Sequence, residues 1–241
     1  MTAGEAHRAM ASLPVADLAT ILGGADPLVV APHPDDESLG CGGLLAMSGG
    51  RGAVVVVTDG TGSHPNSAAY PAPRLRALRE AEAAAATGAL GIGRERLEFL
   101  RLRDTKAPSE GPEFEAAVGA IIDAASRFGC GVLLAPWRHD PHGDHVAVHH
   151  MVVAAARRSG LRHLAYPVWG WTLPADMALE GPAIAGWRLD VTEVLPAKRR
   201  AIAAHVSQST GLIDDDPTGF QLPAAFLERF QTPFETYLTE A

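Results

Sequence analysis

The side chains best suited to chemistry are gathered in a short stretch near the start of the chain. One imidazole and three carboxylates fall within five residues, at His33, Asp35, Asp36 and Glu37. A histidine at the end of an apolar run, followed three residues later by an aspartate, can supply two ligands to a metal ion. Acidic residues also suit the positive end of a helix dipole, but that explanation leaves His33 unused. We therefore predict a metal site that includes His33 and Asp36.

A second group of histidines and aspartates lies much further along the chain. It comprises His139, Asp140, His142, Asp144, His145, His149 and His150. Isolated loop histidines are usually solvated, but this concentration in one strand-to-helix loop favours a site. One histidine from this loop, added to His33 and Asp36, gives three protein ligands. Positions then stay open for water and substrate, as in catalytic zinc sites.

A narrower alternative is a metal pair made by His145 and His149 alone. The two residues share a helix face at i, i+4 spacing. In the zinc proteases with this spacing a glutamate follows the first histidine, whereas Val146 stands here. We therefore prefer the site that joins the two clusters.

Alternating strands and helices are predicted around both clusters. Apolar runs predict strands at 28–31, 53–58, 97–102, 131–136, 163–168 and 187–191, and helical patterns predict helices at 73–90, 113–128, 145–158 and 196–208. Small residues at 40–47 predict a further helix lying close against a sheet. This alternation is typical of an α/β domain with a mostly parallel sheet. The polar loops after Pro32, Thr58, Leu102 and Pro136 then lie at the carboxyl ends of strands, where ligands bind in such sheets.

The whole chain, residues 1–241, is predicted to form one domain. Residues 1–24 form a helical lead-in with one short helix over 15–22, and residues 209–241 form a tail packed on the domain. The sequence contains no internal repeat, low-complexity block or interdomain linker. A chain of 241 residues can bury a single sizeable core.

Composition and charge narrow the classes of partner. The chain is 47% hydrophobic. Its formal net charge of −8 argues against nonspecific binding to nucleic acid or to an anionic membrane. The two cysteines, Cys41 and Cys130, indicate no disulfide framework. The sequence shows neither a signal peptide nor an apolar run long enough for a membrane span. We expect a cytoplasmic protein with a small-molecule partner and no membrane insertion, and the oligomeric state stays open.

The two clusters and several shorter motifs resemble the PIG-L/LmbE-like family of zinc-dependent N-deacetylases. The resemblance rests on Pro-His-Pro-Asp-Asp-Glu at 32–37, Thr-Asp-Gly at 58–60, Arg79-x-x-Glu82, Arg103-Asp104, His-Gly-Asp-His at 142–145 and the segment 198–208. It implies a single Rossmann-like α/β domain with helices on both faces of a mostly parallel sheet. It also implies removal of an acetyl or other acyl group from an amino-sugar conjugate, commonly an N-acetylglucosaminyl one. One departure is Gly143, where the family usually has proline, and this gives His142 extra backbone freedom.

Carried over to this sequence, the resemblance implies that His33, Asp36 and His145 are the zinc ligands. It implies that Asp35 is the general base and that His142 polarises the carbonyl or protonates the leaving amine. These roles suit amide hydrolysis, because zinc lowers the pKa of bound water to about 7 and a neighbouring carboxylate can accept the proton of that water. Two histidines and a carboxylate also hold Fe2+, so zinc is implied by the resemblance rather than by the ligand types.

Other residues are assigned to the substrate or to support. The resemblance implies that Asp104 binds substrate hydroxyl groups, and Arg79 can reach a sugar or a phosphate. Asp144 orients one of the imidazoles, as carboxylates around metal ligands do, or caps the helix that follows it. For His205, a capping or packing role is at least as well supported as a catalytic one.

Three alternative functions compete with this one. A nucleotide-binding Rossmann protein needs a glycine fingerprint after the first strand, whereas the carboxylates at 35–37 would repel a pyrophosphate. A non-catalytic carbohydrate-binding relative is expected to lack a base or a ligand, and all of these residues are present. A hydrolase acting on a thiol-sugar conjugate or on longer acyl chains stays open, because the sequences of the loops at 60–73 and 170–186 do not indicate which substrate they bind. Trp169 and Trp171 either stack on a sugar or pack in the core.

Overall fold

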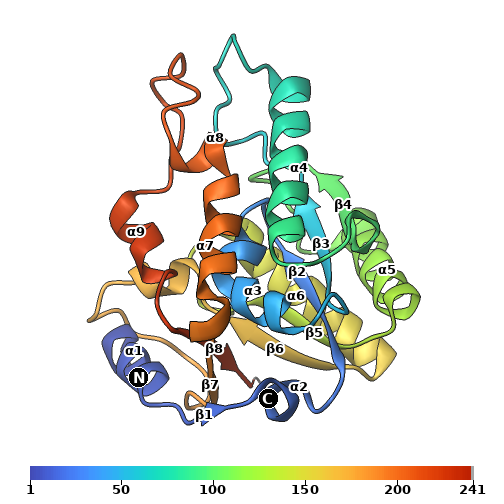
Figure 1. Ribbon diagram of the computed structural model, residues 1–241, viewed down its shortest axis with the longest axis vertical. Helices are drawn as coiled ribbons and strands as arrows, with labels where there is room; N and C mark the ends of the chain where they lie inside the picture. Colours follow the sequence, from blue (N-terminus) through green and yellow to red (C-terminus); the bar gives the residue numbers. More distant parts are fainter. Residues whose placement is uncertain (240–241) are drawn as a thin grey trace.

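An eight-stranded sheet forms the centre of the computed structural model, which describes residues 1–239 (Figure 1). The strands are β1 (Val15–Ala16), β2 (Asp26–Ala31), β3 (Ala53–Thr58), β4 (Leu97–Leu102), β5 (Cys130–Pro136), β6 (Arg162–Tyr166), β7 (Gly186–Asp190) and β8 (Phe234–Leu238). They lie in the order β1, β7, β8, β6, β5, β2, β3, β4. β8 is antiparallel to both of its neighbours, and every other neighbouring pair is parallel. The mostly parallel sheet predicted from the sequence is confirmed.

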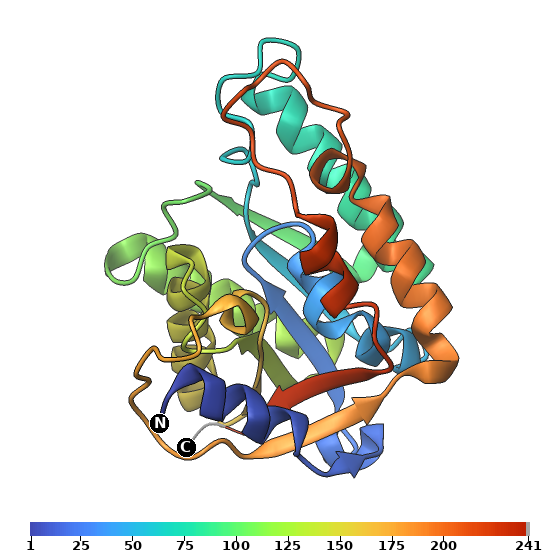
Figure 2. The ribbon, with the colours of Figure 1, turned by 90° about the vertical axis from the view of Figure 1, so that its left-hand side faces the viewer.

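Helices cover both faces of this sheet. They are α1 (Ala3–Ala11), α2 (Leu18–Leu22), α3 (Asp36–Met47), α4 (Ala72–Ala89), α5 (Gly111–Phe128), α6 (Gly143–Ser159), α7 (Leu195–Ala204), α8 (Val206–Ser209) and α9 (Ala224–Arg229). α5 and α6 pack against each other on one face, while α3, α4 and α7 lie together on the other (Figure 2). Short 3-10 turns are η1 (Arg94–Arg96), η2 (Trp169–Thr172) and η3 (Thr192–Val194). Within residues 1–239, no helix combines the length and the apolar character that crossing a bilayer requires.

The central strands are apolar along their length because both of their faces are covered. In β2, Val29 and Ala31 belong to the core layer under α3, α4 and α7. Their neighbours Leu28 and Val30 belong to the layer under α5 and α6. Alternate side chains of one strand therefore supply two separate cores.

Glycines bring α3 close to the sheet. A Cβ atom on Gly40 would lie 2.2 Å from Cδ2 of Tyr166, and one on Gly43 would lie 2.3 Å from Cγ1 of Val191. Neither position has room for a side chain. The close approach predicted from the small residues of this helix is confirmed, and it places Asp36, in the first turn of α3, beside the end of β2.

Predictions near both ends of the chain are wrong in detail. The helix predicted over 15–22 is instead strand β1 followed by α2, which begins after Asp17, whose side chain accepts a hydrogen bond from the Thr20 amide (2.8 Å). The helix predicted over 196–208 divides at His205 (φ −81°, ψ 61°) into α7 and α8. The sequence also missed α1, and it missed β8, which inserts between β6 and β7.

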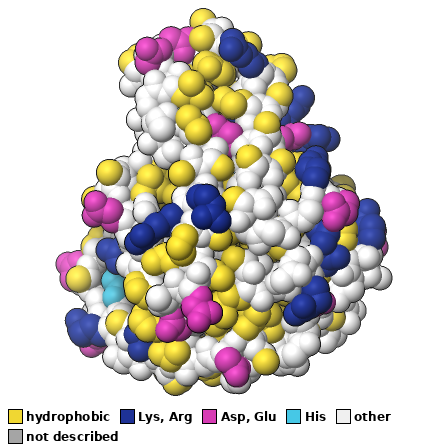
Figure 3. All heavy atoms as spheres, in the orientation of Figure 1, with side chains coloured by type: hydrophobic (Ala, Val, Ile, Leu, Met, Phe, Trp, Pro, Cys, Tyr) yellow, Lys and Arg dark blue, Asp and Glu magenta, His cyan; other side chains and the backbone are white. Residues whose placement is uncertain are grey.

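Two loops project together from one end of the molecule (Figures 1 and 2). They are the β3–α4 loop (59–71) and the C-terminal loop (210–223). Asp216 accepts a hydrogen bond from the Asn66 amide (2.8 Å), and Asp215 accepts one from the Ala69 amide (2.8 Å). Figure 3 shows hydrophobic side chains gathered over this projecting part, with acidic and basic side chains among them. The carboxylates of Asp215 and Asp216 in the C-terminal loop thus hold the backbone of the β3–α4 loop.

Candidate metal centre and active site

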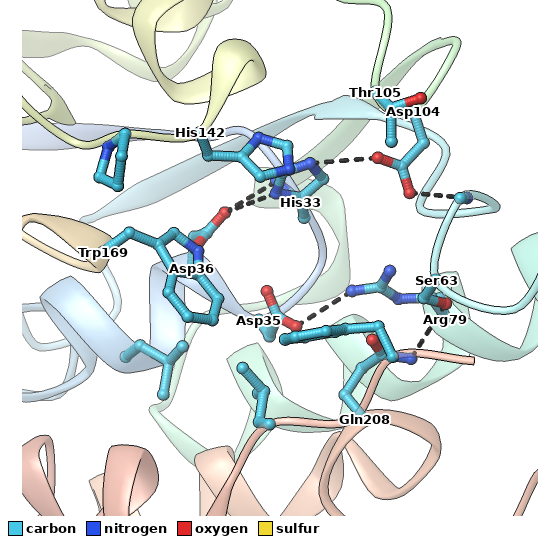
Figure 4. Close-up of a pocket in the computed structure, with 15 residues that line it drawn as sticks. His33, Asp35, Asp36, Ser63, Arg79, Asp104, Thr105, His142, Trp169 and Gln208 are labelled. Carbon is cyan, nitrogen blue, oxygen red and sulfur yellow. Dashed lines mark hydrogen bonds and ion pairs between the residues drawn. The ribbon is translucent and has the colours of Figure 1, made fainter. Parts of the chain in front are cut away.

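The loops after four neighbouring strands enclose a cavity of about 440 Å³ (Figure 4). Its polar lining comprises His33, Asp35 and Asp36 after β2, Gly62 and Ser63 after β3, Asp104 and Thr105 after β4, and His142 after β5, together with Arg79 and Gln208. The predicted meeting of these loops at the carboxyl ends of parallel strands is confirmed.

His33, Asp36 and His145 form a buried cluster at this cavity. Asp36 Oδ2 lies 3.2 Å from His33 Nδ1 and 3.3 Å from His145 Nε2. His145 is fully buried, and apart from this contact with Asp36 its Nε2 forms no hydrogen bond among the described residues. Buried polar atoms are rarely left unpaired, so this nitrogen has the surroundings expected of a metal ligand. A second combination is also close: ring nitrogens of His33, His142 and His145, one from each residue, lie within 4.8 Å of one another. The cluster fits a divalent metal, with Asp36 or His142 beside the two buried imidazoles.

His33 lies between carboxylates on both sides of its ring. Its Nε2 is 3.0 Å from Asp144 Oδ2 and 3.2 Å from Asp104 Oδ1, while its Nδ1 faces Asp36. His33, Asp104 and Asp144 form a second group of ligand-type atoms within 4.8 Å of one another. Asp144 therefore contacts one of the imidazoles, as expected of an orienting residue.

α6 begins at Gly143 rather than at residue 145, and this changes the interpretation of two residues. His142 is the N-cap, and its Nδ1 accepts a hydrogen bond from the Asp144 amide (3.2 Å). The Asp144 carboxylate instead accepts hydrogen bonds from the amides of Thr105 (2.8 Å) and Ala107 (3.0 Å). The helix-cap alternative for Asp144 is therefore wrong. The bond to Nδ1 holds His142 in place despite the freedom that Gly143 allows.

Asp140 orients His145, and the sequence did not predict this role. Asp140 Oδ2 lies 3.0 Å from His145 Nδ1. The same carboxylate accepts hydrogen bonds from the amides of Val168, Trp169 and Gly170. Its place in the second cluster was a signal, but spacing along a loop does not show which imidazole a carboxylate will meet.

Asp35 is held in an unusual backbone conformation (φ 149°, ψ −31°), which costs roughly 1–3 kcal/mol for a residue other than glycine. Its amide donates a hydrogen bond to Glu37 Oε2 (3.0 Å), and its Oδ2 accepts one from Arg79 Nη2 (3.0 Å). Arg79 is buried and also donates to the carbonyls of Pro34 and Gly60. Arg79 thus lines the cavity, but its guanidinium chiefly fixes Asp35.

Asp35 and Asp36 have opposite electrostatic surroundings. Burial raises the pKa of Asp35 to about 7, although Arg79 opposes the shift. Burial acts in the same direction on Asp36, but His145 and His33 outweigh it and hold the pKa of Asp36 well below its usual range. Burial lowers the pKa of His142, and so do His33 and His145. Environments that separate the pKa values of neighbouring acids are typical of sites where the two have different roles.

His205 belongs to a buried group behind the start of α3. Its Nε2 lies 3.1 Å from Glu37 Oε1 and 3.2 Å from Ser38 Oγ. Burial disfavours the charged imidazole, but the Glu37 carboxylate outweighs this effect and raises the pKa of His205. Because Glu37 also accepts the hydrogen bond of the Asp35 amide, His205 supports Asp35 through one intervening residue.

The chain is similar in fold to solved structures with more than one activity. The N,N'-diacetylchitobiose deacetylase of Pyrococcus horikoshii superposes with a TM-score of 0.62 at 19% sequence identity, and the match covers 92% of this chain and 86% of that one. The 4-carboxy-2-hydroxymuconate hydratase of Pseudomonas putida superposes with a TM-score of 0.56 at 19% identity, covering 86% and 82%. The fold alone therefore does not select one reaction.

Similarity in sequence is more specific. The 1D-myo-inositol 2-acetamido-2-deoxy-alpha-D-glucopyranoside deacetylase of Nocardia farcinica is 32% identical over an alignment of 257 residues, which covers 80% of this chain and 83% of that protein. The sequence model of the PIG-L family, described as GlcNAc-PI de-N-acetylase, matches residues 28–156, more than half of the chain. These residues include both histidine-aspartate clusters, and the chain belongs to the PIG-L family.

Proposed function

We propose that this PIG-L family member is a metal-dependent hydrolase that removes the N-acetyl group from an amino-sugar conjugate, in particular an N-acetylglucosaminyl one. The proposal is carried by Asp36 Oδ2, which lies within 3.3 Å of imidazole nitrogens of both His33 and His145, beside Asp35 in the same cavity. The relatives named above as deacetylases of an acetamido-glucopyranoside and of diacetylchitobiose support the class of substrate.

His33, Asp36 and His145 are the residues that would hold the metal. Zinc is the ion we propose, and Fe2+ is the alternative that the same ligand types accept. When bound, the metal supplies Lewis acidity toward water and toward the oxygen of the substrate carbonyl. The burial of the three side chains and the contacts of Asp36 Oδ2 with both imidazoles support this assignment. His142 is less buried than these three, and we assign it to the substrate.

Asp35 is proposed to transfer a proton from the attacking water to the amide nitrogen. A carboxylate oxygen accepts a proton from the attacking water as the bond between the water oxygen and the carbonyl carbon forms. Asp35 then returns the proton to the amide nitrogen as the carbon–nitrogen bond breaks, which releases acetate and the free amine. Burial raises the pKa of Asp35, and a raised pKa makes the carboxylate a better proton acceptor.

His142 is proposed to polarise the carbonyl rather than to protonate the amine. Because its Nδ1 accepts a hydrogen bond from the Asp144 amide, the proton of the neutral imidazole is on Nε2. That N–H can donate a hydrogen bond to the carbonyl oxygen, where negative charge develops during attack by water. The lowering of its pKa by burial supports the neutral form.

Asp104 and Arg79 are proposed to face the sugar. Both residues line the cavity. Asp104 Oδ2 accepts a hydrogen bond from the Gly62 amide (2.8 Å), and a carboxylate has further lone pairs for a sugar hydroxyl group. Arg79 contributes mainly through the position that it gives to Asp35.

The test is release of free amine from N-acetylglucosamine-containing compounds by purified protein of measured metal content. We expect turnover that requires zinc or Fe2+ and is lost on chelation. Asp35→Asn protein, prepared in the same way, controls for a contaminating deacetylase. If fully metal-loaded protein released no amine from any N-acetylated sugar, the proposed function would be refuted.

A further inference from the structure

The two sides of the cavity differ in chemistry. Figure 4 shows Asp104, Ser63 and Arg79 on one side and Trp169 on the other, with His33, Asp36 and His142 between them. The side of Trp169 continues into an apolar surface of Phe220, Leu222 and Leu39. The cavity lining therefore has a polar part (the polar wall) and an apolar part (the apolar wall), and the two meet where Phe220 lies beside Ser63.

The apolar wall is built on a supported aromatic side chain. Trp169 stacks on Phe226 of α9, with ring centroids 4.2 Å apart and an interplanar angle of 12°. Phe220 meets Trp169 nearly edge-on, with ring centroids 5.8 Å apart. Phe220 is 43% exposed although it lines the cavity, so part of its ring remains available to a ligand.

The backbone that carries Phe220 and Leu222 is tied to the rest of the site. The Phe220 amide donates a hydrogen bond to the Ser63 carbonyl (2.7 Å), and the Leu222 amide donates one to the Gln208 carbonyl (2.8 Å). The bonds of Asp215 and Asp216 to the β3–α4 loop add to this support. The wall is thus positioned before a ligand arrives, which limits the entropy that binding must cost.

The reaction fixes which part of the substrate meets which wall. The amide carbon has to lie beside Asp35 and the metal cluster, and its acyl group and its sugar-bearing nitrogen point in different directions. A sugar needs hydrogen-bond partners, which the wall of Asp104, Ser63 and Arg79 provides. The acyl group then faces Trp169. A methyl group can contact only part of an apolar surface that several side chains form.

We propose that Trp169, Phe220, Leu222 and Leu39 form an acyl-chain subsite, so that this enzyme accepts N-acyl groups longer than acetyl. The inference rests on the proposed function and specifies the acyl side of its substrate. Each methylene of an acyl chain that becomes buried against this wall is worth roughly a fourfold gain in transition-state binding.

The experiment compares N-acetyl, N-butanoyl and N-hexanoyl derivatives of one methyl glucosaminide, with amine release as the readout. We expect kcat/KM to rise at least about tenfold from acetyl to butanoyl or hexanoyl. The hexyl glycoside of N-acetylglucosamine serves as the second arm. Its kcat/KM should differ little from that of the N-acetyl methyl glucosaminide. A gain with the hexyl glycoside and none with the longer acyl groups would assign the wall to the aglycone and overturn the inference.

Phe220→Ser tests the wall itself, with Leu212→Ser as the matched control. Leu212 is 41% exposed and lies in the same C-terminal loop, but it is not among the residues that line the cavity. Phe220→Ser should lower the ratio of kcat/KM for the hexanoyl substrate to kcat/KM for the acetyl substrate about tenfold. Leu212→Ser should leave this ratio unchanged.

The failures of the two proposals differ. Turnover of the acetyl substrate without any gain from a longer acyl group would overturn the subsite and leave the proposed function in place. Absence of amine release from every substrate would overturn both.

Discussion

At the scale of single residues, the adjacent Asp35 and Asp36 have different surroundings, and we expect them to have different roles. Asp35 meets Arg79, whereas Asp36 meets two imidazoles. We expect Asp35→Asn to keep its metal and to lose at least about 10²-fold in turnover, the size typical of a lost general base. Asp36→Asn should lose metal. Elemental analysis and amine release, measured on the same samples, separate these effects. Equal metal loss in both variants would contradict the division.

Metal content should also distinguish His145 from His149. His145 Nε2 faces Asp36, whereas His149 Nδ1 donates a hydrogen bond to the Pro136 carbonyl (3.1 Å). We expect His145→Ala to remove most of the metal and His149→Ala to retain it. Circular dichroism of both variants shows whether either substitution unfolds the protein, since both side chains are buried. Retention by His145→Ala together with loss by His149→Ala would favour the helix pair instead.

Residue types and spacing located the candidate site but not its hydrogen bonds. The sequence pointed to both clusters, because a strand-end histidine with nearby carboxylates supplies the residue types that bind metal ions. It did not predict that Asp140 would meet His145 or that Arg79 would meet Asp35. Those contacts depend on side-chain directions across loops that the chain brings together only on folding.

At the scale of elements, one buried glutamate joins three of them. Glu235 of β8 accepts hydrogen bonds from Lys198 Nζ of α7 (2.6 Å), from the α3 amides of Gly43 (2.6 Å) and Leu44 (2.8 Å), and from Tyr237 Oη (2.7 Å). Lys198 and Glu235 are both almost fully buried. Removing one partner of such a pair leaves an uncompensated buried charge.

We therefore expect Glu235→Gln to destabilise the fold by about 3–5 kcal/mol, or roughly 10 °C in Tm. Thermal unfolding followed by circular dichroism measures the change. Glu228→Gln, at an exposed position of α9, is the matched control and should shift Tm by no more than about 1–2 °C. A Glu235→Gln protein with the Tm of the control would show that the pair contributes little to stability.

Elements with one uninterrupted pattern were predictable, and those defined by their partners were not. β3 and β5 are long apolar runs, and α4 and α5 are long helical ones. β1 has two residues and exists because it pairs with β7. β8 includes the buried Glu235, whose partners come from distant helices, so its sequence lacks the plain alternation of a strand.

At the scale of the whole molecule, the sheet separates two apolar layers and carries the candidate site at one edge. Cys41 belongs to the layer under α3, α4 and α7, and Cys130 belongs to the layer under α5 and α6. Both thiols are buried. Burial raises the pKa of Cys41 well above its usual value and raises the pKa of Cys130 to about 11. Labelling of Cys41 and Cys130 can therefore show when the apolar layer on each face of the sheet unfolds.

The thiolate is the form that reacts with iodoacetamide, and raising the pKa of a thiol lowers its thiolate fraction at a given pH. At pH 8 a thiol with a pKa of about 11 is roughly 0.1% thiolate, and burial blocks access as well. We expect neither cysteine to be labelled in the native protein at pH 8, and both to be labelled once it unfolds. Brief alkylation at increasing urea concentrations, read by mass spectrometry, should give molecules with no label or with two, because strands that supply both layers must unfold together. Accumulation of singly labelled protein at intermediate urea would show that one layer opens before the other.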